Sequence, residues 1–141
     1  MNILSVENDI DFKKCLELRE TIFVQEQNIP IELENDELDS SAKHFLLLEN
    51  SMQIGVARVV KNGKIAIIGR VGVLKNFRKT GAGTFLIKEI IEYCKSENYK
   101  KIVLGSQEHA VGFYSKLGFK ISSERYMDAN IPHYKMELIL T

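Results

Sequence analysis

The chain has 141 residues, of which 45% are hydrophobic and 27% charged, and its basic and acidic side chains balance to a formal net charge of zero. This length supports one hydrophobic core, so we expect a single domain over residues 1–141. The neutral balance gives no general attraction to nucleic acid or to an anionic membrane. There is no long apolar run and no basic segment near the start, so we expect no membrane span and no signal peptide.

Two cysteines, Cys15 and Cys94, each fall on the apolar face of a predicted helix. A catalytic cysteine needs a neighbouring group that lowers the pKa of its thiol, and the sequence offers none beside either residue. We therefore expect two buried thiols and a reducing, cytoplasmic setting.

The chain opens with a short predicted strand over residues 3–6. A helix follows from an Asp9 N-cap to about Phe23, because its apolar residues recur at helical spacing. Pro30 and the acid-rich residues up to Ser41 predict a long loop, which in a compact domain is often functional.

The remaining predicted elements are strands over 44–49, 54–60, 65–74, 102–106, 119–125 and 133–140, and helices over 81–97 and 108–117. The dipeptide Asn62-Gly63 is a strong hairpin signal, so the first three of these strands are expected to form an antiparallel meander. A helix separates the third strand from the fourth, which predicts a parallel pair with a right-handed crossover. This order indicates an α/β fold with a mixed sheet and helices on both faces.

Charge is distributed unevenly along the chain despite the zero sum. Residues 21–42 contain six acids and no Lys or Arg, whereas residues 58–101 contain eleven Lys or Arg and three acids. One interpretation is an ordinary solvated surface. The other is a bipolar site, with a cationic substrate near the acidic segment and a polyanionic cofactor near the basic one. The sequence leaves both open.

The most informative stretch is Ile67–Ile91, which has the pattern of a strand, a basic glycine-containing turn and an amphipathic helix. Unpaired N–H groups and the positive end of the helix dipole make such a turn an anion site, most often for phosphate. A dinucleotide site needs a third glycine where Leu86 stands, and a triphosphate loop needs a Gly-Lys-Ser/Thr sequence, which is absent. Both common phosphate motifs are therefore disfavoured.

The turn Arg78-Lys79-Thr80-Gly81-Ala82-Gly83 resembles the acetyl-CoA-binding motif of the GNAT N-acetyltransferase superfamily, and Phe113–Phe119 resembles the second signature of that superfamily. Phe23–Gln27, before the acidic loop, and Ile131–Met136 are similar to the small bacterial branch of ElaA-like and YjcF-like proteins. The resemblance implies acetyl-CoA as co-substrate and transfer of its acetyl group to a primary amine by direct attack.

The same resemblance implies a GNAT-like mixed central sheet of six to seven strands with helices on both faces. The sheet would be splayed between the strand that ends near Leu74 and the strand Ile102–Ser106. It also implies these cofactor-binding residues: Val71, Gly72, Val73, Arg78, Lys79, Thr80, Gly81, Ala82, Gly83, Thr84 and Gln107. Amides of the turn would wrap the pyrophosphate, Val71 and Val73 would pair with the pantetheine arm, and Gly72 would mark a bulge between them.

Tyr114 matches the family's general acid, which protonates the departing thiolate. A tyrosine titrates near ~10 and a thiol near ~8.5, so the proton transfer is expected to be close to balanced. Glu26 is the first candidate for the base or the ammonium acceptor, because it matches the start of the family's substrate loop. His109 and His133 are alternatives, also as substrate-binding residues. A purely structural role is the competing interpretation for Tyr114 and for the two histidines.

Other functions remain open alongside a small-molecule acetyltransferase. The fold could serve a CoA-binding sensor without turnover, or an acetyltransferase acting on a protein lysine or N-terminus. No metal site is visible in the sequence, and the basic stretch lacks the interleaved exposed aromatics expected for nucleic-acid binding. A homodimer is common in such folds, and nothing in the sequence identifies the amine.

Overall fold

The computed structural model describes residues 1–34 and 36–140, so Asn35 in the acidic run and Thr141 lie outside the described part. The strands are β1 (Asn2–Ser5), β2 (Lys43–Glu49), β3 (Met52–Asn62), β4 (Ile65–Val73), β5 (Lys101–Gln107), β6 (Lys120–Ile121), β7 (Tyr126–Asp128) and β8 (Ile131–Ile139). The main helices are α1 (Asp9–Arg19), α2 (Ile31–Glu34), α3 (Ala82–Ser96) and α4 (Val111–Lys116). Short 3-10 turns occur at η2 (Glu37–Ser40), η3 (Lys75–Phe77) and η4 (Glu108–Ala110).

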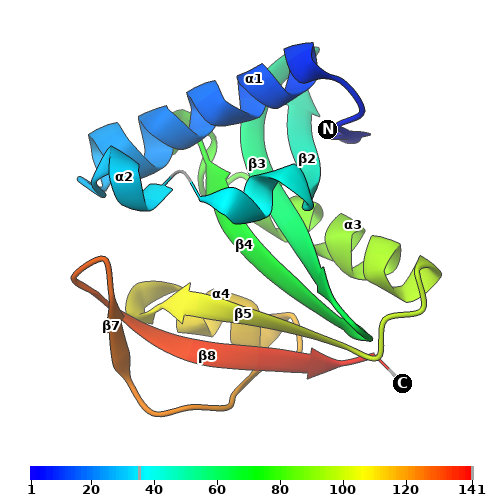
Figure 1. Ribbon diagram of the computed structural model, residues 1–141, viewed down its shortest axis with the longest axis vertical. Coiled ribbons are helices and arrows are strands. Elements are labelled where there is room, and N and C mark those ends of the chain that lie inside the picture. Colours follow the sequence, from blue (N-terminus) through cyan, green and yellow to red (C-terminus); the bar gives the residue numbers. More distant parts are fainter. Residues whose placement is uncertain (35, 141) are drawn as a thin grey trace.

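One mixed sheet of eight strands runs through the molecule in the order β1-β2-β3-β4-β5-β8-β6, with β7 also paired to β8. Helices α1 and α2 lie on one face, and α3 and α4 lie on the other (Figure 1). The predicted fold class, with helices on both faces, is therefore confirmed. The strand count is higher than the expected six to seven because the predicted strand over 119–125 is reduced to β6, and an unpredicted short strand, β7, follows it.

The Ser123 side chain explains why β6 ends early. Ser122 N–H still donates to the Lys135 carbonyl at 2.8 Å, but Lys135 N–H donates to the Ser123 hydroxyl oxygen at 2.9 Å. A side chain thus takes the place of a backbone acceptor, which interrupts the ladder. The chain pairs again with β8 only at Tyr126.

The first helix begins and ends differently from the expectation. Asn8, and not Asp9, is the N-cap, since its side chain accepts from the Asp11 N–H at 2.8 Å. Helix α1 ends at Arg19 and continues directly into a π-helical segment, η1 (Glu20–Glu26). The expected α-helix up to Phe23 is therefore wrong in its last turn. Such π-helical turns are rare and often lie at functional sites.

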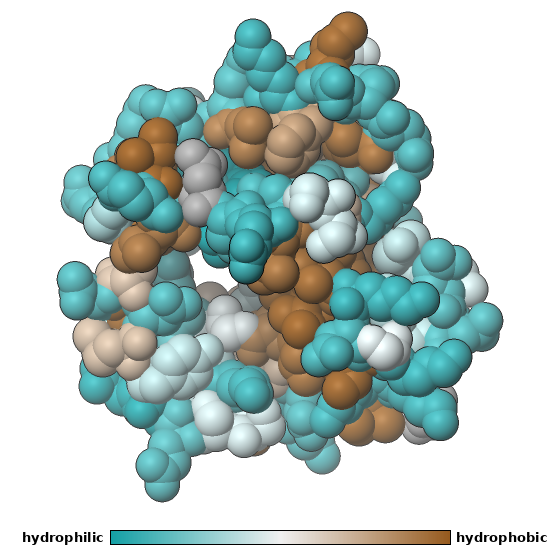
Figure 2. Space-filling view, viewed as in Figure 1, coloured by the Kyte–Doolittle hydropathy of each residue, from teal (hydrophilic) through white to brown (hydrophobic). Residues whose placement is uncertain are grey.

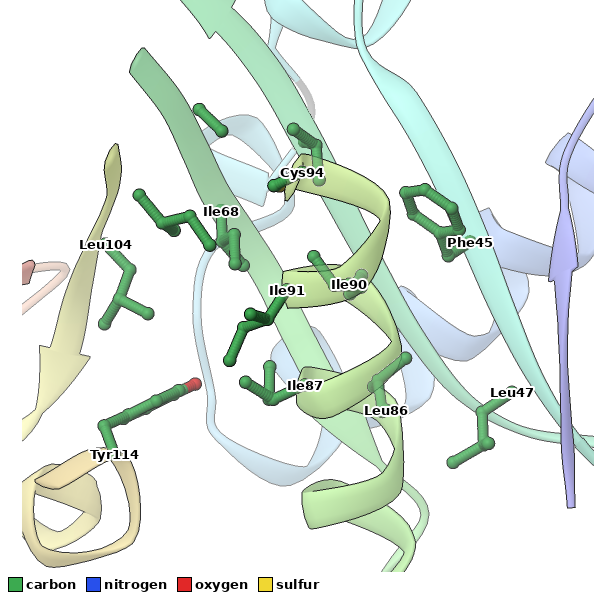
Figure 3. Packing of buried hydrophobic residues seen from close by; sticks show 14 of the residues in the cluster. Phe45, Leu47, Ile68, Leu86, Ile87, Ile90, Ile91, Cys94, Leu104 and Tyr114 are labelled. Carbon is green, nitrogen blue, oxygen red and sulfur yellow. The ribbon is translucent and has the colours of Figure 1, made fainter. Parts of the chain in front are cut away.

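The meander β2-β3-β4 is antiparallel, as predicted. Successive strand residues face opposite sides, so Phe45 and Leu47 pack in the core under α3 while Leu46 packs under α1. Figure 3 shows the α3 side, where the apolar residues predicted for this helix meet the sheet: Leu86, Ile87, Ile90, Ile91 and Cys94. The parallel pairing of β4 with β5 is also confirmed.

Both cysteines are fully buried in these two cores, Cys15 on the inner face of α1 and Cys94 on the inner face of α3. Burial raises the pKa of each thiol to about 12, so both stay protonated near neutral pH. Within residues 1–34 and 36–140, none of the helices combines the length and hydropathy that a membrane span requires.

The bulge expected at Gly72 lies instead at Arg70 and Val71, where the register between β3 and β4 shifts and Arg70 adopts a φ of 52°. Gly72 has a different constraint. A Cβ at this position would lie 3.0 Å from Ile22 Cγ2 and 3.2 Å from Phe23 Cζ. The glycine therefore allows η1 to pack directly on β4.

We expect Gly72→Ala to lower the free energy of unfolding by about 1–3 kcal/mol, because the added methyl overpacks against η1. Gly112→Ala is the matched control, since a Cβ there meets no atom within 4 Å. It lies inside α4 and should be neutral or stabilising by about 0.5–1 kcal/mol. Urea denaturation of both variants measures the difference, and equal stabilities would contradict this account of Gly72.

Candidate active site

A cleft opens where the two central strands separate. Strands β4 and β5 pair only from Ile65 and Lys101 to Ile68 and Leu104, and beyond these residues they diverge. Figure 1 shows them leaving a common corner near the C-terminus and spreading apart. The cleft between them has a volume of about 720 Å³ and appears as an opening in the space-filling view (Figure 2). The predicted splay of the sheet is thus confirmed.

The glycine-containing turn borders this cleft at the start of α3. Lys79 and Gly81 adopt φ angles of 62° and 88°, and the first intrahelical bond runs from Phe85 N–H to the Gly81 carbonyl at 3.0 Å. The amides of residues 82–84 precede that bond, so they have no partner within the helix. This geometry is suited to an anion.

The cleft brings together most of the predicted site residues. Its lining includes Glu26, Val71, Gly72, Val73, Arg78, Gly83, Gln107, His109, Tyr114 and His133. The remaining cofactor candidates, Lys79, Thr80, Gly81, Ala82 and Thr84, belong to the adjoining turn and helix start and do not line it. Among them Ala82 is buried in the core under α3.

Glu26 and Arg78 form a bidentate ion pair, with both nitrogen–oxygen distances at 2.5 Å. Arg78 also donates to the Val73 carbonyl at 2.9 Å. The hydrogen bonds and charge of Arg78 hold the pKa of Glu26 below its usual range. Glu26 is therefore a weaker proton acceptor in this arrangement than the sequence prediction requires. The pair also connects η1 to the glycine-containing turn.

The Tyr114 side chain extends from α4 toward Ile87 and Ile91 of α3, and its hydroxyl group points toward these residues (Figure 3). Its ring contacts Phe113 and Phe119 edge to face, at centroid distances of 5.0 and 5.7 Å. Burial raises the pKa of Tyr114 to about 12, so the hydroxyl keeps its proton near neutral pH.

Polar side chains cross the cleft between η1 and the end of β5. Gln107 Nε2 donates to Gln27 Oε1 at 2.9 Å, and His109 Nε2 lies 2.8 Å from Gln107 Oε1. His133 lies opposite Gln107 on β8 and is mostly buried, with Nδ1 at 2.7 Å from the Ile131 carbonyl oxygen. The third histidine, His44, lies away from the cleft under η2, where burial lowers its pKa.

The acidic segment is tied to the sheet by a loop clamp of three arginines and three carboxylates: Arg19, Arg58, Arg70, Glu34, Asp36 and Asp39. Arg19 is fully buried, and it binds Glu34 and both oxygens of Asp39, the latter at 2.9 and 3.0 Å. Arg58 binds both oxygens of Asp36 at 2.7 and 2.9 Å. Buried charges are tolerated only when they are paired in this way.

Arg70, at the bulge of β4, closes the clamp from the cleft side. It donates to the Glu34 carbonyl at 2.9 Å, to the Leu33 carbonyl at 3.2 Å and to Asp36 at 3.2 Å. The three cations of the clamp balance its three anions, so these acids are not available to a cationic substrate. The bipolar-site interpretation is wrong for Glu34, Asp36 and Asp39, because their partners come from distant parts of the sequence.

The cleft lining also contains polar residues to which the sequence patterns assigned no role, among them Gln27, Arg70 and Tyr126. Arg70 carried a signal, since it is a lone charge within an apolar strand. Tyr126 carried none, because its place depends on the interrupted strand before it. Among residues 1–34 and 36–140 no group of three or more His, Cys, Asp or Glu could hold a metal ion.

A family model described as the acetyltransferase (GNAT) domain matches residues 14–140. The chain belongs to the GNAT acetyltransferase family. The uncharacterized N-acetyltransferase YjcF of Bacillus subtilis (strain 168) is 31% identical over 137 residues, which cover 96% of this chain and 98% of YjcF. Protein ElaA of Escherichia coli (strain K12) is 33% identical over 126 residues, covering 86% of this chain and 82% of ElaA. These relatives confirm the predicted family and branch, and make the chain an N-acetyltransferase.

Solved structures agree with this GNAT assignment. The crystal structure of E. coli ElaA matches with a TM-score of 0.85 at 28% identity, covering 97% of this chain and 99% of that one. A Bacillus subtilis acetyltransferase in complex with CoA matches with a TM-score of 0.76 at 19% identity and 99% coverage of both chains. The second similarity, at this low identity, concerns the fold.

The loop clamp predicts a defined dependence of stability on pH. Burial alone would raise the pKa of Asp39, but its hydrogen bonds with Arg19 and Arg58 outweigh burial and leave the pKa below its usual range. A carboxylate whose pKa is lowered by folding stabilises the protein above its unfolded value of about 3.9, and this contribution is lost as the pH falls toward the folded pKa. We therefore expect Asp39→Asn to weaken the decline of stability in acid.

At neutral pH the same variant should lose about 3–5 kcal/mol of unfolding free energy, because two buried guanidinium groups lose a charged partner. Glu32→Gln is the matched control: Glu32 is exposed on α2, and the change should stay within about 0.5 kcal/mol. Urea denaturation between about pH 3 and pH 7 measures both effects. An acid decline as steep in Asp39→Asn as in the wild type would contradict the expected role of this carboxylate.

Proposed function

We propose that this GNAT enzyme transfers an acetyl group from acetyl-CoA to a primary amine by direct attack, with Tyr114 as general acid. The observation that carries the proposal is the cleft itself, whose lining combines the separating edge of β4, the start of α3 and the side chain of Tyr114. CoA is bound in a B. subtilis structure of this fold, and acetyl-CoA in one from Elizabethkingia anophelis with a TM-score of 0.74.

The cofactor would lie along the edge of β4 that β5 leaves unpaired beyond Ile68. In this proposal Val71 and Val73 pair with the pantetheine arm, and the amides of residues 78–84 surround the pyrophosphate. Gln107 would bond the arm after exchanging its contact with Gln27. Backbone N–H groups near Val71 would stabilise the negative charge that develops on the thioester oxygen.

The buried position of Tyr114 changes the expected proton transfer. With the pKa of Tyr114 raised to about 12, the difference from a thiol near ~8.5 is roughly three units, so the transfer is not close to balanced. The proton must therefore move as the C–S bond breaks. The tyrosinate is then neutralised at once by the far more acidic nitrogen of the newly acylated amine.

The acceptor in this proposal is a small molecule. A cleft of about 720 Å³ is within the range typical of small-molecule sites. On the acceptor side it is bordered by η1 and by residues Leu33 and Glu34 of the segment that the clamp holds in place.

Tyr114→Phe should lower kcat for amine-dependent CoA release by about 10²–10⁴-fold, the usual contribution of a positioned general acid. Acetyl-CoA binding measured by calorimetry should be unchanged, because only a hydroxyl is removed. Tyr99→Phe, which removes a hydroxyl from a tyrosine outside the cleft, is the control and should keep the wild-type kcat. Equal rates for Tyr114→Phe and wild type would remove Tyr114 from the mechanism.

A further inference from the structure

A row of polar side chains crosses the sheet at the mouth of the cleft. Gln107, His133 and Tyr126 are direct partners across β5, β8 and β7, so they point to the same face. That face is the one covered by η1, because Gln107 bonds Gln27. Tyr114 packs in the core on the other face, under α3. An amine that enters from the η1 side would therefore contact these three side chains. The proposed acid, Tyr114, lies on the opposite face of the sheet.

The ring of His133 is held in one orientation with one nitrogen available. The Ile131 carbonyl can only accept, so Nδ1–H donates to it at 2.7 Å and Nε2 keeps its lone pair. The ring stacks on Tyr126 at a centroid distance of 5.7 Å and an angle of 27°. A Cβ on Gly105 would lie 2.6 Å from the Tyr126 hydroxyl oxygen and 3.9 Å from His133 Cδ2. The glycine therefore makes room for the Tyr126 ring that stacks on His133, and His133 itself lines the cleft.

The other basic groups that line the cleft are less suited to take a proton. Both oxygens of Glu26 are bound by Arg78. His109 is exposed, and its Nε2 is engaged with Gln107. Asp128 is exposed at the end of β7, and carboxylates are intrinsically much weaker bases than imidazoles.

We propose that His133 is the general base, and that its Nε2 removes a proton from the ammonium group of the acceptor. The Ile131 carbonyl and the Tyr126 ring are the positioning groups that hold the imidazole. This inference rests on the proposed acetyl transfer and adds to it the group that produces the neutral amine. Base and acid then lie on opposite faces of the sheet, one on each side of the thioester.

Protons and bonds are conserved over the whole transfer. The ammonium gives one proton to His133 Nε2, and the neutral amine forms a C–N bond with the thioester carbonyl carbon. The C–S bond breaks, and the thiolate takes the proton of the Tyr114 hydroxyl. The protonated amide nitrogen returns its second proton to the tyrosinate. His133 then releases its proton to solvent, so the net products are the amide, CoA thiol and one proton.

Several charged or titratable groups surround His133 and bear on its protonation. Tyr126 and Asp128 lie on β7, and Lys135 lies two residues further along β8 on the same face. His109 follows Gln107 on η4, and the Glu26–Arg78 pair and Arg70 line the cleft across from them.

The test compares pH profiles of kcat/KM for wild type, His133→Asn and His133→Gln, with 2-phenylethylamine, ethanolamine and spermidine as probe amines. Asn can keep the bond to the Ile131 carbonyl through its amide N–H, and it removes only the Nε2 position. Wild type should reach a plateau above neutral pH. In His133→Asn the rate at neutral pH should fall about 10²–10⁴-fold and rise about tenfold per pH unit, because the variant depends on amine already neutral in solution.

His133→Gln, which loses the Ile131 bond as well, should show the same slope, and the control Tyr99→Phe, outside the cleft, should keep the plateau of the wild type. Unchanged acetyl-CoA binding by calorimetry establishes that each variant is folded. A plateau in both His133 variants overturns the base while leaving the proposed function intact. Absence of amine-dependent CoA release by wild type with every probe overturns the proposed transfer, and the base with it.

Discussion

Strands β4 and β5 share hydrogen bonds over only four residue pairs, and the rest of the site depends on their separation. Arg70 lies at the bulge between β3 and β4, two residues beyond the last pair with β5, and it donates to the carbonyls of Leu33 and Glu34. Three features follow from this divergence: the unpaired edge of β4, and the positions of Tyr114 and His133 in the lining of the cleft. If β4 and β5 were paired along their whole length, the cleft and these three features would be absent.

Different forces hold the two sides of the cleft. On the α3 side, Ile87, Ile91 and Tyr114 belong to a continuous apolar core, and such packing depends little on pH or salt. On the α1 side, the loop clamp holds the acidic segment through ion pairs. Removing one partner leaves a buried charge without compensation. Acidification should therefore loosen the acceptor side before the cofactor side.

Sequence patterns predicted the parts of this protein that depend on local chemistry. The meander, the α3 face and the glycine-containing turn follow from periodicity and hairpin residues, and the paired motifs indicated Tyr114 and the family. The π-helical η1 was not predicted, because the apolar residues up to Phe23 keep helical spacing, and the close approach of Ile22 and Phe23 to Gly72 exists only in the fold. The charge interpretation of the acidic segment failed for a related reason: Arg19, Arg58 and Arg70 are distant in sequence and adjacent only in the fold.

The two cysteines have a practical consequence. Both are fully buried, and each thiol has its pKa raised to about 12, so almost no thiolate is present at neutral pH. Disulfide reagents that detect free thiols react with the thiolate form. In the native enzyme such reagents should therefore register the CoA released on turnover and leave the protein unmodified, which makes a continuous colorimetric assay of this enzyme possible without mutating Cys15 or Cys94.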